Sequence, residues 1–195
     1  YTPTGASGEI TTRGLTITAN DVHKSYGTAI TGGAGSTAFT SSGLQNSETI
    51  GTVTIAYGTG SAASAVAGTY ATQVTPSAGV DGTFTASNYV ITYAKGAIIV
   101  DKLAVTVTAL TGTKVYDGLL TSAGAPTVGT LATGDAVLTA PTQVYDDPNV
   151  GTTHVLSASG LTIENAAHAN VTASYDITYT PTGASGEITT RGLTI

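Results

Sequence analysis

The first seventeen residues of the chain, YTPTGASGEITTRGLTI, occur again without a single change at residues 179–195. An identical match of this length does not arise by chance. A fixed period is the sequence signature of a tandem array. We therefore expect one full repeat followed by the start of the next, cut from a much longer molecule. Such arrays usually supply length and many copies of one surface rather than a single catalytic pocket.

A weaker symmetry divides the period into two halves that carry the same landmarks in the same order. Each half has an alternating strand, a Lys-x-Tyr segment near a glycine, and a closing strand of the form Tyr-x-Ile-Thr-Tyr. Two domains of about 100 residues each also suit the length of the period. We expect two diverged modules with boundary segments on either side: 1–13 as the last strand of the preceding module, 14–101, 102–191, and 192–195 as the start of the next repeat.

The composition predicts β-structure throughout. Thr and Val favour strands, and 25 glycines supply turns between them. Alternation or β-branched enrichment indicates strands at 50–57, 69–74, 136–140 and 153–161. The only helical candidates are short stretches around 44–49 and 164–169, neither of which reaches the length of an ordinary helix. The fold class is therefore all-β, with small β-sandwich or β-grasp-like modules and at most one short helix in each. The short connectors between modules lack a flexible Gly/Ser or Pro-rich composition, so we expect a semi-rigid rod.

Several function classes are disfavoured by what the sequence lacks. Cysteine is absent, which excludes disulfides and cysteine-based metal sites. A net charge of −6 with six scattered basic residues disfavours nucleic acid as a partner. The sequence contains no run of 18 apolar residues, so we expect no membrane insertion by this segment. Neither a Gly-x-Ser-x-Gly elbow nor a phosphate-binding loop occurs, so we expect no enzyme and no obligate cofactor.

The ordered landmarks resemble the MBG and YDG repeat modules. The first half is similar to an MBG module, with Asn88-Tyr89 before its closing strand. The second half is similar to a YDG module, with Lys114-Val115-Tyr116-Asp117-Gly118 and a later Asn149-Val150-Gly151. This resemblance implies a filamentous-haemagglutinin-like or biofilm adhesin of Gram-negative bacteria, secreted to the cell surface, whose module pairs form a stalk. Some relatives bind exopolysaccharide or host glycan, which makes these the candidate partners besides neighbouring repeats.

Tyrosine supplies most of the aromatic bulk, because the chain has 10 Tyr, 2 Phe and no Trp. Tyr89 and Tyr93 share one face of their strand, as do Tyr175 and Tyr179, and we interpret them as core residues whose hydroxyls bind backbone. The alternative is that these four tyrosines form a platform on which sugar rings stack. Tyr26 and Tyr116 are interpreted as strand-end residues that pack across a tight turn, where glycine supplies an unusual backbone conformation. The candidate ligand-binding residues are Tyr26, Tyr116 and Tyr145.

The acidic loop offers one candidate metal site. Its oxygen ligands would be Asp146, Asp147 and Asn149, which suit Ca²⁺, a hard cation that takes six or more oxygens. The spacing does not match an EF-hand loop, and Asp and Asn before Pro are also ordinary turn residues.

The function predicted from these patterns is a structural stalk segment of a giant secreted bacterial cell-surface or biofilm adhesin. Two alternatives stay open. One is a repeat that binds polysaccharide or mucin glycan. The other is an extracellular fibre in which residues 1–13 complete a module of a neighbouring chain by strand donation. The Thr-x-Thr runs also suggest ice binding, but they occur once per module rather than as a stacked ladder.

Overall fold

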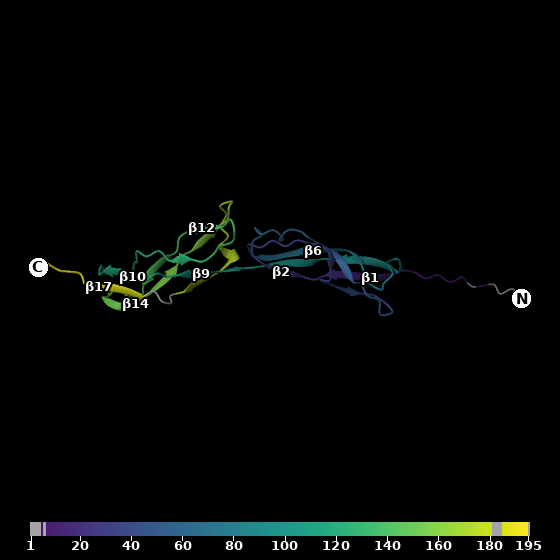
Figure 1. Ribbon diagram of the computed structural model, residues 1–195, viewed down its shortest axis with the longest axis horizontal. Helices are drawn as coiled ribbons and strands as arrows, with labels where there is room; N and C mark the ends of the chain where they lie inside the picture. The colour runs from purple at the N-terminus through teal and green to yellow at the C-terminus, as the bar shows by residue number, and fades with distance from the viewer. Residues whose placement is uncertain (1–4, 6, 181–184, 195) are drawn as a thin grey trace. The chain divides into compact units, whose positions relative to one another are not determined.

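The computed structural model describes residues 5, 7–180 and 185–194. The chain divides into two compact units, which are considered separately (Figure 1). Unit 1 comprises Tyr1–Lys24 and Thr28–Val100, and unit 2 comprises Ser25–Gly27 and Asp101–Ile195. The described residues are mostly strands, with one short 3-10 helix in each unit, which confirms the predicted all-β class. In this part of the chain, no helix is long and apolar enough to cross a membrane.

Unit 1 contains a three-stranded sheet in the order β4-β1-β7 and a five-stranded sheet in the order β2-β8-β6-β5-β3. The 3-10 helix η1 (Ala86–Asn88) leads directly into β7. The strands are β1 (Arg13–Ala19), β2 (Val22–Ser25), β3 (Gly33–Ser36), β4 (Phe39–Ser42), β5 (Thr52–Tyr57), β6 (Gly68–Val80), β7 (Tyr89–Ala94) and β8 (Gly96–Asp101).

Unit 2 contains sheets in the orders β11-β9-β16, β10-β17-β14-β13 and β12-β15. The 3-10 helix η2 (Thr172–Ser174) precedes β16 as η1 precedes β7. The strands are β9 (Leu103–Thr108), β10 (Gly112–Val115), β11 (Thr127–Val128), β12 (Ala136–Thr139), β13 (Thr142–Tyr145), β14 (Gly151–Ser159), β15 (Thr162–Glu164), β16 (Tyr175–Thr180) and β17 (Ser185–Thr189).

The apolar residues of each first strand alternate with threonines and face a core. In β1, Leu15, Ile17 and Ala19 are buried, and β1 packs against β6 of the second sheet of unit 1. In β9, Val105 and Val107 are buried in the same way, and β9 contacts β14. Each unit is thus built of sheets packed face to face, which favours the sandwich alternative over the β-grasp one.

Parallel strand pairs carry the chain through each unit. In unit 1, β1 pairs in parallel with β7, and β2 lies beside β8 in the next sheet. Unit 2 follows the same plan, since β9 pairs in parallel with β16 and β10 with β17. Figure 1 shows that β2 lies beyond β1 along unit 1, and that β10 lies beyond β9 along unit 2. The chain therefore enters each unit at one end and leaves it at the other.

The two helical predictions are wrong. Residues 44–49 and 164–169 contain turns, and Asn46, Ser47 and His168 have positive φ values that a right-handed helix does not allow. The short helices lie instead directly before β7 and β16. Asn, Ser and His favour reverse turns in polar segments. A segment of six residues is also too short to be stable as a helix on its own.

The two copies of the repeated sequence have different environments. Ile188 in β17 lies between β10 and β14 and is 1% exposed, whereas its identical counterpart Ile10 is 101% exposed. Leu15 and its counterpart Leu193 differ in the same way, with Leu193 the exposed one. Residues 7–12 form no strand, and residues 1–4, 6 and 195 of the predicted boundary segments lie outside the described residues. The same sequence thus forms the buried strand β17 where β10 and β14 lie beside it, and forms no strand at residues 7–12. Neighbouring strands therefore decide whether this segment is a strand.

Candidate functional site

The two Lys-x-Tyr segments lie at the ends of β2 and β10, and the first of them contributes Tyr26 to a polar cluster of unit 2. Tyr26 belongs to unit 2 and is 2% exposed. Its backbone N–H donates to the carbonyl of Asp101 over 2.8 Å. Its hydroxyl donates to Oδ2 of Asp135 over 2.8 Å, and the hydroxyl of Tyr175 donates to the same oxygen over 2.7 Å. One carboxylate thus accepts from two tyrosines.

Burial and hydrogen bonding both favour the neutral phenols in this cluster. Burial raises the pKa of Tyr175 to about 12, and its hydrogen bond to Asp135 contributes in the same direction. The pKa of Tyr26 is raised further, again by burial first and by Asp135 second. Both tyrosines are therefore neutral donors at physiological pH, and the Asp135 carboxylate is the acceptor they share.

Gly27 makes the approach of Tyr26 possible. Its φ of +84° is a conformation that glycine adopts without steric cost. A Cβ at this position would lie 2.8 Å from Cβ of Ala132, which is closer than such atoms come. Ala132 in turn donates its backbone N–H to the hydroxyl of Tyr175 over 2.9 Å. The glycine after the tyrosine is thus required both by its positive φ and by the Ala132 methyl group of the facing loop.

Unit 1 has an equivalent cluster built around Tyr89. The backbone N–H of Gln45 donates to the hydroxyl of Tyr89 over 3.1 Å, and that hydroxyl donates to Oε2 of Glu48. The pKa of Tyr89 is raised chiefly by this hydrogen bond to Glu48. The donor and the acceptor are three residues apart in sequence, as are Ala132 and Asp135. The ring in contact with Tyr89 is that of Phe84, 6.4 Å away between centroids.

The second tyrosine of each closing strand binds backbone, which confirms the structural interpretation of these residues. The hydroxyl of Tyr93 accepts from the N–H of Gly79 over 3.0 Å. The hydroxyl of Tyr179 accepts from the N–H of Leu161 over 3.1 Å. The first bond ties β7 to β6 in the second sheet of unit 1, and the second ties β16 to the connection between β14 and β15, so these tyrosines support the fold.

The two lysines of the Lys-x-Tyr segments also have structural partners. Lys24 is buried and donates to the carbonyls of Thr28 and Ala62, each over 2.8 Å, and burial lowers its pKa. Lys114 forms an ion pair with Asp117 over 2.8 Å and donates to the carbonyl of Thr121 over 3.1 Å. Each ammonium group donates to a carbonyl in the loop that follows its own strand, and Lys24 also donates to the loop that follows β5.

The three predicted ligand-binding tyrosines do not lie together. Tyr26 is in the cluster with Asp135, and Tyr145 is 2% exposed, with Nζ of Lys114 lying 5.2 Å from its ring centroid. Tyr116 is 40% exposed, and its backbone N–H donates to the carbonyl of Thr189 over 2.9 Å. Of the three, Tyr116 is the one that offers a ring to a ligand, and its role in binding stays a prediction.

The predicted Ca²⁺ ligands hold their own loop together. Oδ1 of Asp146 accepts from Nδ1 of His154 over 2.9 Å, and this hydrogen bond is the main cause of the lowered pKa of Asp146. Oδ1 of Asp147 accepts from the backbone N–H of Asn149 over 2.6 Å. Among the described residues, no three His, Cys, Asp or Glu side chains gather as a metal site requires. Ca²⁺ binding stays a prediction.

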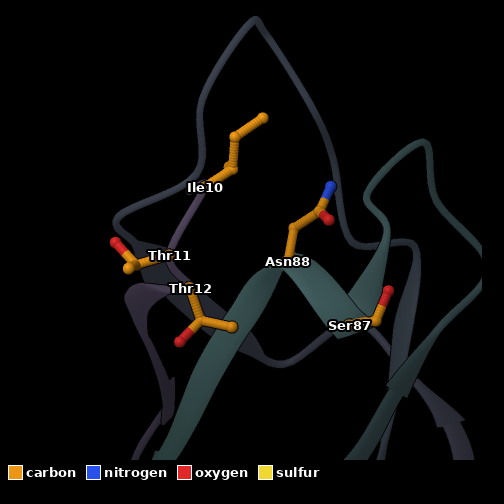
Figure 2. Close-up of a pocket in the computed structure, with 5 residues that line it drawn as sticks. All are labelled: Ile10, Thr11, Thr12, Ser87 and Asn88. Atoms are coloured by element: carbon orange, nitrogen blue, oxygen red, sulfur yellow. The ribbon is translucent and has the colours of Figure 1, made fainter. Parts of the chain in front are cut away.

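A hollow of about 100 Å³ lies where the chain enters unit 1, and it is lined by Ile10, Thr11, Thr12, Ser87 and Asn88. Figure 2 shows the Ile10 and Asn88 side chains on opposite sides of this space. Arg13, the next residue after the lining threonines, lies opposite Tyr89 in the β1–β7 register. The hollow therefore lies at the start of the β1–β7 pair, and its lining residue Asn88 directly precedes Tyr89 in the sequence.

The carboxylates of both clusters and His154 were missed by sequence reasoning. Glu48 and Asp135 are single acidic residues in polar turns, and their partners lie 40 or more residues away. The spacing of three residues between loop donor and carboxylate in both modules was the one available signal. It becomes meaningful once the tyrosines are known to lie above those turns.

Two family models match the chain, one in each half, in the order that the sequence landmarks indicate. The model of the MBG domain (YGX type) matches residues 15–98, and the model of the YDG domain matches residues 101–185. No curated protein and no solved structure matches the chain.

Proposed function

Because this chain is an MBG domain of the YGX type followed by a YDG domain, we propose that it is a load-bearing repeat in the stalk of a secreted adhesin on a bacterial surface. The stalk would hold an adhesive part of the parent protein away from the cell. Both domain families are consistent with a role as repeat modules of a surface adhesin, and both families are non-catalytic. We propose no enzymatic activity for the chain.

The observation that carries this proposal is the path of the chain through each unit. The chain enters unit 1 at the start of β1 and leaves at the end of β8, and paired strands run in the same direction between these points. Tension applied through the chain acts along the strands, so the hydrogen bonds that hold β1, which lie across the strand direction, are loaded together. Such an arrangement suits a repeat whose task is to transmit force.

Single-molecule pulling tests this proposal with a matched control. The absence of cysteine allows two introduced thiols to serve as unique handles. In the first geometry the full chain is pulled through its two termini. In the control the handles are placed at Thr12→Cys and Asn88→Cys, next to the paired residues Arg13 and Tyr89. Pulling there opens the β1–β7 pair from one end, one hydrogen bond after another.

We expect unit 1 to unfold at a clearly higher force when it is pulled through the termini than through the control handles. Forced unfolding reports the unfolding barrier rather than the equilibrium stability, so this difference measures the load path itself. Equal forces, or a lower force through the termini, would contradict a load-bearing role.

Glycan binding is the second candidate, and the exposure of Tyr116 is the observation that favours it. This candidate requires the Tyr116 ring to stay exposed in every repeat of an array, which would then hold many weak sites whose avidity accumulates. An array of glycans and exopolysaccharides, probed with one repeat with and without Ca²⁺, tests it. Saturable binding that Tyr116→Ala abolishes and Tyr70→Ala preserves would support it, whereas silence across the array would leave the stalk role alone.

A further inference from the structure

The Tyr175 and Tyr89 clusters share three features but differ in a fourth. In both, a loop N–H donates to the hydroxyl of the tyrosine, which donates to a carboxylate three residues after that loop donor. In both, the tyrosine begins the strand that pairs with the first strand of its unit. Only in unit 2 does a second tyrosine join the cluster. This is Tyr26, which follows β2 in the sequence and meets Tyr175 edge to face at 5.4 Å, and we call it the incoming tyrosine.

The backbone register defines where an incoming tyrosine sits. The N–H of Tyr26 donates to the carbonyl of Asp101, which lies two residues before Leu103, the partner of Tyr175 in the β9–β16 register. The incoming tyrosine is thus anchored two residues upstream of the residue that pairs with the receiving tyrosine.

Tyr116 has the same anchor in terms of the repeated sequence. Its N–H donates to the carbonyl of Thr189. Residues 179–195 are identical to residues 1–17, so Thr189 corresponds to Thr11. Thr11 lies two residues before Arg13, which pairs with Tyr89 in the β1–β7 register. In a tandem array, Thr189 is also Thr11 of the following copy. Tyr116, bound to that residue, would therefore lie beside Tyr89 of the following copy in the same way that Tyr26 lies beside Tyr175.

We propose that the Tyr89–Glu48 cluster is a docking site for Tyr116 of the preceding copy of this repeat. The hydroxyl of that Tyr116 donates to the Glu48 carboxylate alongside Tyr89, as Tyr26 and Tyr175 share Asp135. The hollow at the start of the β1–β7 pair is lined by Thr11, which would be the anchor, and by Asn88, which directly precedes Tyr89 (Figure 2). Tyr116 itself is exposed in a chain that contains no following Tyr89 cluster. The partner is thus a second copy of this chain.

This inference rests on the tandem-repeat part of the proposed function and does not depend on force transmission or adhesion. The test protein is the full chain with residues 18–195 appended once more after Ile195. Because residues 179–195 already equal the start of a repeat, this chain contains two complete copies in register. The first Tyr116 then has a following Tyr89 cluster, and the second Tyr116 has none.

Docking is measured by the rate at which tetranitromethane nitrates the Tyr116 ring, followed by mass spectrometry. Each Tyr116 is measured with the other replaced by Phe, so that identical peptides are not confused. We expect the first Tyr116 to be modified several-fold more slowly than the second, because docking buries its ring. Equal rates at the two positions would overturn the proposal.

A double-mutant cycle tests the shared carboxylate in the same protein. The pair is Tyr116→Phe in the first copy and Glu48→Gln in the second, and the matched control pair is Tyr116→Phe in the second copy and Glu48→Gln in the first. We expect the first pair to couple by at least about twofold in the unfolding equilibrium constant, as residues in contact do. The control pair should be additive. Additivity in both pairs would overturn the proposal while leaving the load-bearing test unaffected.

Discussion

The rings of Tyr26 and Tyr175 meet edge to face, with centroids 5.4 Å apart and planes at 75°, and both hydroxyls donate to one oxygen of Asp135. Tyr26 is separated in sequence from the rest of unit 2 by more than 70 residues, yet it is one of its buried residues. A polar cluster that is fully bonded within the core of a small β-domain specifies one arrangement of the surrounding strands.

Tyr26→Phe should destabilise unit 2 by about 1.5–3 kcal/mol, the range for a hydrogen bond to a charged group. Chemical denaturation, followed through the loss of near-UV tyrosine signal, measures this change. Tyr116→Phe in the same chain is the matched control and should change the stability by less than about 0.5 kcal/mol, because its ring is exposed. An equal effect of the two substitutions would contradict the role of Tyr26.

The stability of unit 2 should fall as the pH rises from 10 to 12. The phenol of Tyr175 has a pKa of about 12 in the folded chain and about 10 when unfolded. In this window the folded state holds a proton that the unfolded state has released, so the free energy of unfolding falls with pH by about 1.4 kcal/mol per pH unit for each such tyrosine. Denaturation at several pH values measures the slope. Tyr175→Phe should reduce it, and an unchanged slope would contradict the raised pKa.

Gly186→Ala should destabilise unit 2 by about 1–3 kcal/mol, the usual cost of overpacking a core. A Cβ at this position would lie 2.6 Å from Cε1 of Tyr145, whose ring is buried against β17. Thermal unfolding compares this variant with Gly192→Ala, where a Cβ would meet no atom within 4 Å. Similar melting temperatures for the two variants would show that Tyr145 moves aside without cost.

Lys24→Met should destabilise unit 1 by about 1–3 kcal/mol, because the carbonyls of Thr28 and Ala62 lose a charged donor in a buried place. Lys95→Met, on the exposed surface of the same unit, is the control and should be nearly neutral. Hydrogen exchange on unit 1 amides separates a local loss of the loop from global unfolding. A Lys24→Met protein as stable as the control would show that water replaces the ammonium group there.

The Asp146–His154 pair should contribute to stability above about pH 4 and lose that contribution in acid. The hydrogen bond from His154 holds the pKa of Asp146 below its ordinary value of 3.8, so the contribution is present above that value and is lost as the pH falls through the lower, folded pKa. Asp146→Asn should flatten the acid limb of the stability curve, while Asp176→Asn at an exposed position should leave it unchanged. Parallel acid limbs for all three proteins would refute this.

The sequence predicted the strands well because their pattern is local. The alternation of Leu15, Ile17 and Ala19 indicates one buried face, and the structure buries that face. The exact repeat and the order of landmarks also led to the two families that match. Local patterning, however, cannot show what fills the space above a strand. Ile10 and Ile188 are identical in local sequence, and their burial differs because only one has β10 and β14 beside it.

The candidate site was harder to predict for the same reason. Tyr26 stands beside a glycine in the sequence, but its partners Asp135 and Tyr175 lie 109 and 149 residues away. No spacing rule links residues that meet through the pairing of β9 with β16. The adjacent aspartates of the acidic loop suggest a cation site, whereas in the structure their carboxylates accept hydrogen bonds from His154 and from a backbone N–H of the same turn.

The central claim is that repeats of this chain build an extended stalk. Small-angle X-ray scattering on proteins of one, two and four repeats tests it most directly. We expect the maximum dimension to grow in proportion to the number of repeats. A compact assembly grows much more slowly, roughly as the 0.38 power of chain length, and a freely jointed one roughly as its square root. Either of those weaker dependences would contradict the stalk.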